Sequence, residues 1–176
     1  RRVGTFVMSG LRIDVAELAG RPGASKEISR SEQIAGLRVP LGGVEDEDQV
    51  DISLLAESVI EGIAVSGTLE GRVHLSCSRC LVEFTEPFRH QVDETYFFTG
   101  DEETYRITAN TIDLEPMVRD VVLLSIPPSP LHAPECKGLC PVCGGDLNEF
   151  DCGHRQDLTD LRWAPLKALL SEEERG

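Results

Sequence analysis

Long apolar runs are missing from this sequence of 176 residues. No stretch of about 18 consecutive apolar residues occurs, which argues against a membrane-spanning helix. The first residues contain no apolar segment of the kind found in secretory signals. The sequence leaves open whether a segment was removed before Arg1. We therefore expect a cytoplasmic protein that has no membrane partner.

Catalytic signatures are missing as well. The sequence contains no His-Glu-x-x-His motif, no glycine-rich phosphate loop and no Gly-x-Ser-x-Gly motif. The zinc deaminase pattern also fails, because neither His74 nor His90 is followed two residues later by a glutamate. We expect a protein that is not an enzyme and has no small-molecule substrate.

Basic residues are scarce. The chain has 17 Lys and Arg against 31 Asp and Glu, a formal charge of −14, and only three of the basic residues are lysines. Such a chain is a poor general binder of nucleic acid, because affinity for phosphate comes from Lys and Arg contacts. It is better suited to a basic protein partner, although net charge alone does not decide the matter.

The six cysteines lie at spacings typical of metal sites. Cys77-Ser-Arg-Cys80 and Cys140-Pro-Val-Cys143 each have the form of a zinc knuckle, a tight turn that carries two thiolates. A disulfide framework is less favoured, because cysteines three apart rarely form a disulfide with each other. A chain of this length can also bury a hydrophobic core without disulfide cross-links. A redox motif would begin a helix after a buried strand, whereas Cys140 to Cys143 lie among Gly, Pro and Asn. We expect one or two structural zinc ions.

The candidate ligands form two groups in chain order. The first group is Cys77, Cys80, His132 and Cys136. The second group is Cys140, Cys143, Cys152 and His154. One interpretation gives each group its own tetrahedral ion. A second joins Cys136 to the three cysteines of the second group in a single site, and a third joins the two Cys-x-x-Cys pairs. The sequence leaves these open, and each histidine could instead be a solvated loop residue.

The apolar pattern predicts an α+β fold that is mainly antiparallel β. From Val50 to Phe98 apolar residues alternate with period two between short turn signals, which indicates a meander in a barrel or sandwich. This places Cys77 and Cys80 at the tip of a hairpin. Residues 37–41 resemble an edge strand interrupted by Pro40, and the polar stretch from Ser25 to Gln33 is expected to be flexible.

A helix is predicted after the meander. Apolar residues recur at helical spacing, with Asp113 as a candidate N-cap, and this helix should cover the open face of the sheet; the residues are Leu114, Met117, Val118, Val121 and Leu124. A short C-terminal helix is predicted after Asp160. We expect residues 1–126 to form the β domain with its covering helix, and residues 127–176 to form a Cys-rich zinc-binding segment with the terminal helix, packed on the first.

Several strings together resemble a known family. They are Ser76-Cys-Ser-Arg-Cys80-Leu81, Leu114-Glu-Pro-Met-Val-Arg-Asp120, Cys136-Lys-Gly-Leu-Cys-Pro-Val-Cys-Gly144 and Arg162-Trp163-Ala164. The sequence is similar, from about Leu11 to Leu170, to the bacterial YceD-like family of large ribosomal RNA subunit accumulation proteins. The resemblance implies a role in the accumulation of large-subunit ribosomal RNA, in ribosome assembly or precursor processing. It also implies association with a basic zinc-ribbon protein of the large subunit.

Four functions are compatible with these observations. The first is a non-enzymatic assembly factor that acts through basic ribosomal protein partners or on a pre-ribosomal particle. The second is a direct RNA-binding zinc module. It predicts a basic face around the first knuckle, made by Arg72, Arg79, Arg89 and Arg106. The third, a metal-dependent RNA hydrolase, predicts an open zinc position. The fourth, a zinc or redox sensor, predicts a labile metal and easily oxidised thiolates.

Overall fold

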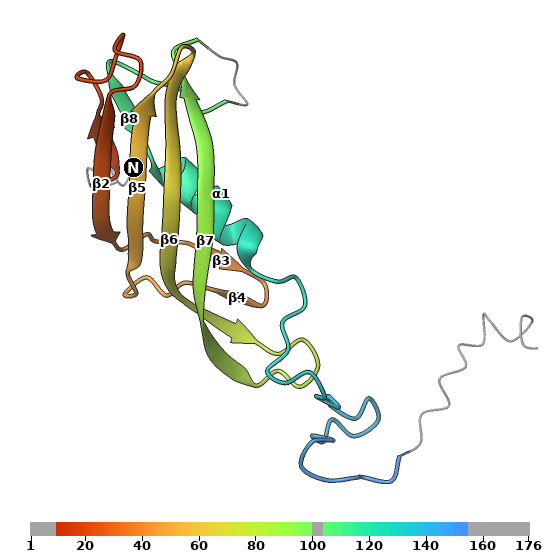
Figure 1. The fold of residues 1–176 in the computed structure, drawn as a ribbon. Helices are drawn as coiled ribbons and strands as arrows, with labels where there is room; N and C mark the ends of the chain where they lie inside the picture. Colours follow the sequence, from red (N-terminus) through yellow and green to blue (C-terminus); the bar gives the residue numbers. More distant parts are fainter. Residues whose placement is uncertain (1–9, 100–103, 155–176) are drawn as a thin grey trace, which may run out of the picture. The chain divides into compact units, whose positions relative to one another are not determined.

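A computed structural model describes residues 10–99 and 104–154 of the chain (Figure 1). The chain divides between Cys136 and Lys137 into two compact units. Every named helix and strand of the described residues belongs to the first unit. The boundary that we expected after residue 126 lies ten residues before this division, just after the helix that ends at Ser125. The expected packing of the second segment on the first stays a prediction.

The meander predicted from Val50 onward is confirmed. It consists of β5 (Val50–Ser58), β6 (Gly62–Ser76) and β7 (Glu83–Phe97), each antiparallel to the next. β6 runs unbroken through Gly67, although a glycine within an alternating pattern is usually a turn or bulge signal. Gly67 has a φ of +149°, and a Cβ there would lie 2.2 Å from the carbonyl oxygen of Ser53. This glycine therefore allows close pairing of β6 with β5 and does not end the strand.

The prediction of a flexible stretch after Ser25 is wrong. Residues Ser25–Glu32 form strand β2, and all eight of them pair antiparallel with β5. Only Ile28 is buried, so the strand shows no clear alternation of apolar and polar residues. The backbone ladder to β5 holds it in place at an edge of the sheet, where polar side chains on both faces are tolerated.

The segment around Pro40 forms two very short strands. β3 (Arg38–Val39) and β4 (Gly42–Gly43) pair with each other, and β4 also pairs with β6. The strands of this sheet pair in the order β2-β5-β6-β4-β3. β7 lies outside this order and pairs with β6. A separate two-stranded sheet joins β1 (Arg12–Asp14) to β8 (Thr111–Asp113).

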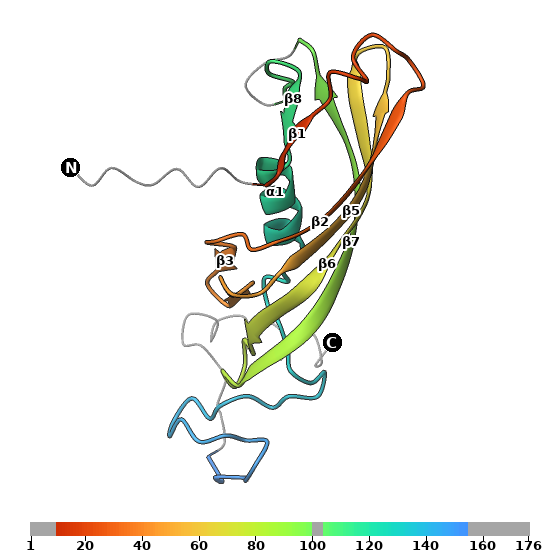
Figure 2. The same ribbon diagram turned by 90° about the vertical axis from the view of Figure 1, so that its left-hand side faces the viewer.

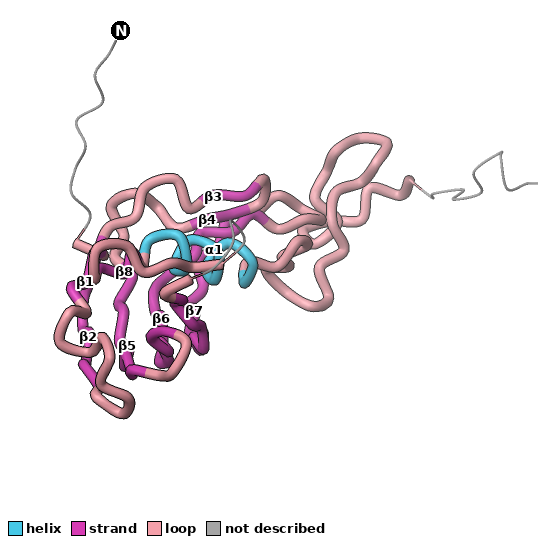
Figure 3. Tube along the Cα trace, turned by 90° about the horizontal axis from the view of Figure 1, so that it is seen from above, coloured by secondary structure: helices cyan, strands magenta, loops and turns pink. Residues whose placement is uncertain are grey.

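The six-stranded sheet curls like half of a barrel, and α1 (Glu115–Ser125), β1 and β8 lie on its concave side (Figure 2). Seen from above, the helix extends along the face formed by β6 and β7 (Figure 3). Side chains of the meander alternate between this face and solvent, as its period-two pattern indicates. The buried apolar side chains of β5 and β6 on this face are Val50, Ile52, Leu54, Ala56, Ile63, Val65, Leu69, Val73 and Leu75.

The covering helix is confirmed, but one residue predicted to lie on its buried apolar face is exposed to solvent. Leu114, Met117 and Val118 are buried, whereas Leu124 is 86% exposed. The buried stripe continues through Val122, because residues 114, 118 and 122 follow one another at four-residue steps on one face. The predicted N-cap, Asp113, lies one residue too early, because α1 begins at Glu115 with Leu114 at its N-cap position and no side-chain cap there. The Oδ1 atom of Asp113 still accepts a hydrogen bond of 3.0 Å from the backbone N–H of Glu115.

One expectation, the C-terminal helix after Asp160, lies outside the described residues. Among the described residues, no helix is long and apolar enough to cross a membrane.

Two leucines of the helix region test which side of α1 meets the sheet. We expect Leu114→Ala to lower the free energy of unfolding by about 2–4 kcal/mol, because a fully buried side chain is removed. Leu124→Ala is the matched control and should change it by less than about 0.5 kcal/mol. Urea unfolding followed by circular dichroism measures both. Equal effects of the two substitutions would contradict the packing described for α1.

Candidate metal centres

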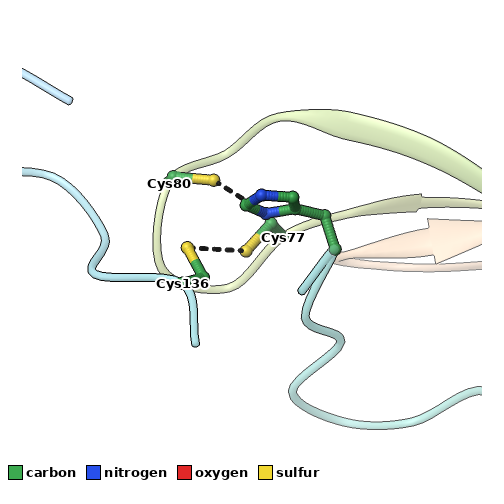
Figure 4. A group of neighbouring side chains, drawn as sticks. Cys77, Cys80 and Cys136 are labelled. Atoms are coloured by element: carbon green, nitrogen blue, oxygen red, sulfur yellow. Dashed lines mark hydrogen bonds between the residues drawn. The ribbon is translucent and has the colours of Figure 1, made fainter. Parts of the chain in front are cut away.

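The first group is assembled from two parts of the first unit that are distant in sequence. Cys77 and Cys80 lie in the loop between β6 and β7, and His132 and Cys136 lie in the segment that follows α1. Their ligand atoms all lie within 4.8 Å of one another. The Sγ atoms of Cys77 and Cys136 are 3.8 Å apart, and the Sγ of Cys80 lies 3.3 Å from Nδ1 of His132. The three cysteines point toward one another (Figure 4).

These distances fit a tetrahedral ion better than a disulfide. Zn–S bonds of about 2.3 Å and Zn–N bonds of about 2.0 Å give tetrahedron edges of about 3.8 Å between sulfurs and about 3.5 Å between sulfur and nitrogen. A disulfide needs sulfurs about 2.05 Å apart, whereas Cys77 and Cys136 are separated by 3.8 Å. None of the six cysteines, all of which lie among the described residues, forms a disulfide. The first group could therefore hold a metal ion without rearrangement.

The second group lies entirely within the second unit. The Nδ1 atom of His154 is 3.8 Å from Sγ of Cys140 and 3.3 Å from Sγ of Cys152, and Cys143 completes the set within the same 4.8 Å limit. Its burial differs from that of the first group. Cys140 is buried, but Cys143 is exposed and Cys152 partly exposed, whereas all three cysteines of the first group are buried. The second group is thus the more accessible to solvent.

The two Cys-x-x-Cys segments share one backbone geometry around their first sulfur. The N–H groups of Arg79 and Cys80 donate to the sulfur of Cys77. The N–H groups at the equivalent positions, two and three residues after Cys140, donate to the sulfur of Cys140. Such bonds stabilise a thiolate and leave it free to coordinate a cation. Both segments, called knuckles below, therefore share one turn geometry around a sulfur, and that they are zinc knuckles stays a prediction.

The two knuckle loops also close in the same way. The N–H of Cys77 donates to the carbonyl of Val82 at 2.9 Å, and the N–H of Leu81 donates back to the carbonyl of Cys77 at 2.9 Å. The same two bonds in the second knuckle join Cys140 to Gly145 and to Gly144, at 2.8 and 2.7 Å. The residue after the second cysteine is left-handed in both, with φ of +62° at Leu81 and +72° at Gly144.

Opposing influences on the thiol pKa values show what a cation would change in the first group. Burial raises the pKa of Cys77, but hydrogen bonds from the side chain and backbone of His132 and from nearby N–H groups outweigh it and lower the pKa to about 5. A hydrogen bond from Val82 lowers the pKa of Cys80, but burial and the two neighbouring sulfurs raise it to about 11. The sulfurs thus repel each other as thiolates, and a bound divalent ion would remove that repulsion.

The second group shows the same division. Hydrogen bonds from the N–H groups of Cys143 and Val142 lower the pKa of Cys140 to about 6. The backbone of His154 acts on Cys152 in the same sense, but the sulfur of Cys140, burial and the sulfur of Cys143 outweigh it and raise the pKa of Cys152. In each group, one thiol ionises readily while another is opposed by its neighbours.

Neighbouring groups fix the segment that carries His132 and Cys136. The guanidinium Nη1 of Arg79 donates to the carbonyl of Cys136 at 2.8 Å, and the N–H of Ser78 donates to the carbonyl of Pro130 at 2.8 Å. The loop between β6 and β7 therefore contacts the later segment through its backbone as well as its cysteines. Such supporting contacts orient ligands and are part of a metal site.

Among the three interpretations of the ligand set, the structure agrees with the first. It brings together Cys77, Cys80, His132 and Cys136 as one cluster, and it brings together the second group as another. The other two interpretations combine residues from both units, whereas each cluster here has four donors within one unit. Both histidines present Nδ1 to their cysteines. That each cluster binds an ion stays a prediction.

The structure does not gather the four arginines of the predicted basic face around the first knuckle. Arg79 lies in the knuckle, but Arg89 lies in β7 opposite Glu70 and forms an ion pair with it at 3.2 Å. Arg106 lies beside Phe97, at the other end of β7. That end is about 48 Å along the strand from Glu83, because an antiparallel strand rises about 3.4 Å per residue. Arg72 lies within β6, opposite Pro87. The four arginines therefore do not surround the knuckle.

Sequence analysis missed two features of this site. One is the contact of Arg79 with the Cys136 carbonyl, for which the sequence carries no signal because the two residues meet only in the folded chain. The other is the left-handed backbone of Leu81. A signal existed for this second feature, since the equivalent position of the other knuckle is a glycine, the residue that adopts such a backbone most readily.

Comparison with known proteins gives relatives but no structural template. No solved structure is detectably similar to this chain. The uncharacterized protein Rv2926c of Mycobacterium tuberculosis is 36% identical over 176 residues, which cover 95% of this chain and 84% of the relative. The uncharacterized protein ML1660 of Mycobacterium leprae is 28% identical, and the alignment covers 95% of this chain and 81% of the relative. The uncharacterized protein YlbN of Bacillus subtilis is 29% identical over 113 residues, and the alignment covers 61% of this chain and 66% of the relative.

A sequence profile of one family matches residues 65–170, a range that includes both Cys/His clusters. The description of this family is large ribosomal RNA subunit accumulation protein YceD. The match covers more than half of the chain and agrees with the resemblance found in the sequence strings. The chain belongs to the YceD family of large ribosomal RNA subunit accumulation proteins.

Proposed function

We propose that this protein is a non-enzymatic cytoplasmic factor for the accumulation of large-subunit ribosomal RNA. In this proposal two structural zinc ions hold the knuckles, and the protein acts through basic proteins of the large subunit or of its precursor particle. The observation that carries the proposal is the family match over residues 65–170, which contain both Cys/His clusters.

The donor sets support zinc in a structural role. Each cluster offers three sulfurs and one imidazole nitrogen, a ligand set typical of closed, four-coordinate zinc sites. When all four protein donors bind, no position stays open for the water molecule that a hydrolytic zinc site requires. The first group would use this ion to join the β6–β7 loop to the segment after α1. Free thiols of this kind also persist most readily in the reducing cytoplasm.

Charge supports a protein partner over RNA. The chain carries a formal charge of −14, and the arginines considered for RNA binding are spread from one end of β7 to the other. Phosphate contacts would be too few in any one place for strong RNA binding. A basic ribosomal protein, in contrast, would be attracted by long-range electrostatics.

The first test of this proposal is the metal count. We expect the purified protein to contain two zinc ions, and we expect Cys77→Ser and Cys140→Ser each to contain one, because the two residues occupy equivalent positions in separate clusters. Metal analysis by mass spectrometry gives the count. His90→Ala, which alters a residue outside both clusters, should retain two. Loss of all zinc in a single variant would indicate one shared site instead.

The second test concerns the cell. We expect a strain that lacks this protein to contain less mature large-subunit ribosomal RNA relative to small-subunit RNA. The wild-type gene should restore the ratio, and a Cys77→Ser/Cys80→Ser variant should not, because it removes two ligands of the first cluster. Quantification of both RNAs on gels measures the ratio. An unchanged ratio in the deletion strain would contradict the proposal.

The third test concerns the partner. The immobilised full-length protein should retain proteins extracted from purified large ribosomal subunits, and this binding should weaken as salt rises, since salt screens attraction between opposite charges. Ribosomal RNA freed of protein serves as the comparison probe and should bind weakly. Tight binding of the RNA, with no salt-sensitive protein retained, would favour the RNA-binding function.

A further inference from the structure

Leu81 adopts a backbone conformation that its side chain disfavours. Its φ of +62° matches the +72° of Gly144, the residue in the same place of the second knuckle. Both close the loop by donating to the carbonyl of the first cysteine. Left-handed backbone suits glycine, whereas a leucine Cβ is crowded against the following carbonyl oxygen. The fold of a knuckle alone would therefore be served better by glycine at position 81.

Burial does not offset this strain within the described chain. The Leu81 side chain is 60% exposed and that of its neighbour Val82 is 45% exposed. Two adjacent apolar side chains thus lie largely in water at the tip of a rigid hairpin. Strained non-glycine residues that persist in a fold are found mainly at functional sites and ligand clamps.

We propose that Leu81 and Val82 form an apolar anchor that inserts into an apolar pocket of a basic protein. The anchor lies at the loop that links β6 and β7, the two longest strands of the sheet. Binding interfaces are commonly built around an aromatic or aliphatic anchor that fills a pocket of the partner. This inference rests on the proposed function, since it names the contact through which a ribosomal protein would be held.

The charges around the anchor define the rim of the partner's pocket. Glu83 follows the anchor directly and is exposed, and Glu135 is exposed beside Cys136. Three thiolates and one divalent ion leave the first cluster with a net charge of about −1. The cations next to the cluster in sequence are Arg79, which donates to the Cys136 carbonyl, and the exposed Lys137. The surroundings are therefore net acidic, which favours a pocket rimmed by Lys or Arg over RNA or a second copy of this acidic chain.

The first cluster would hold the anchor in position. Cys77 and Cys80 lie in the same loop as the anchor, and the bonds between Cys77 and Leu81 and between Cys77 and Val82 set the direction of the anchor. An ion bound to both cysteines would fix this loop before the partner arrives. Such preorganisation raises affinity because less ordering remains to be done on binding.

The Leu81→Gly substitution tests the anchor without disturbing the fold, because it removes the leucine side chain and suits the left-handed backbone at this position. It gives the first knuckle the residue that the second already has, so the variant should melt at the same temperature as the wild type or higher and retain two zinc ions. Ile60→Ser is the matched control. Ile60 is 91% exposed and lies in the turn between β5 and β6, at the opposite end of β6 from the knuckle.

The probe is the RNA-free protein fraction extracted from purified large ribosomal subunits. Each zinc-loaded full-length protein is immobilised, and the dissociation constant of the retained protein is measured at fixed salt. We expect Leu81→Gly to weaken binding by about tenfold or more, the loss typical of an anchor residue, and Ile60→Ser to bind like the wild type.

Two outcomes would overturn the inference in different ways. If the wild type and Leu81→Gly retain the same protein with equal affinity, the anchor is wrong while the proposed function stands. If the wild type retains no ribosomal protein, the proposed partner fails and the anchor fails with it. Loss of binding in Ile60→Ser to the same extent as in Leu81→Gly would also count against a specific anchor.

Discussion

The structure depends on the meeting of two segments that are far apart in sequence. Cys77 and Cys136 are separated by 59 positions, yet their sulfurs lie 3.8 Å apart. An ion that joined them would act like a cross-link, and by the chain-entropy argument a link closing a loop of this length stabilises the fold by on the order of 4 kcal/mol. The contacts of Ser78 with Pro130 and of Arg79 with Cys136 hold the same two segments together. The cluster thus continues a contact that the backbone already makes.

Local patterns in the sequence predicted most of the elements that carry this site. The alternation from Val50 onward predicted the meander, and the helical spacing after Asp113 predicted α1, because both patterns arise directly from burial of one face. The knuckles were predictable for a similar reason, since residues three apart must turn sharply to share an ion. In these cases a short stretch of sequence contains the whole physical cause.

Features that depend on tertiary partners were not predictable. β2 was missed because its cause is the ladder to β5, while its own side chains alternate poorly. Leu124 was placed on the wrong face because several helical stripes through α1 are apolar, and only the position of the sheet decides among them. The ligand partition also stayed open until the topology brought His132 and Cys136 to the β6–β7 loop. In each case the sequence allowed several answers, and contacts between distant residues decide which one occurs.

The order of the first group along the chain has a consequence for biosynthesis. Translation proceeds from the N-terminus, so the hairpin that carries Cys77 and Cys80 leaves the ribosome well before Cys136 is made. Strands β5, β6 and β7 are neighbours in sequence and can pair early, because closing short loops costs little entropy. A nascent chain at that stage presents half of the first Cys/His cluster at the end of a formed hairpin. Completion of the first cluster is therefore among the last steps in the maturation of this unit.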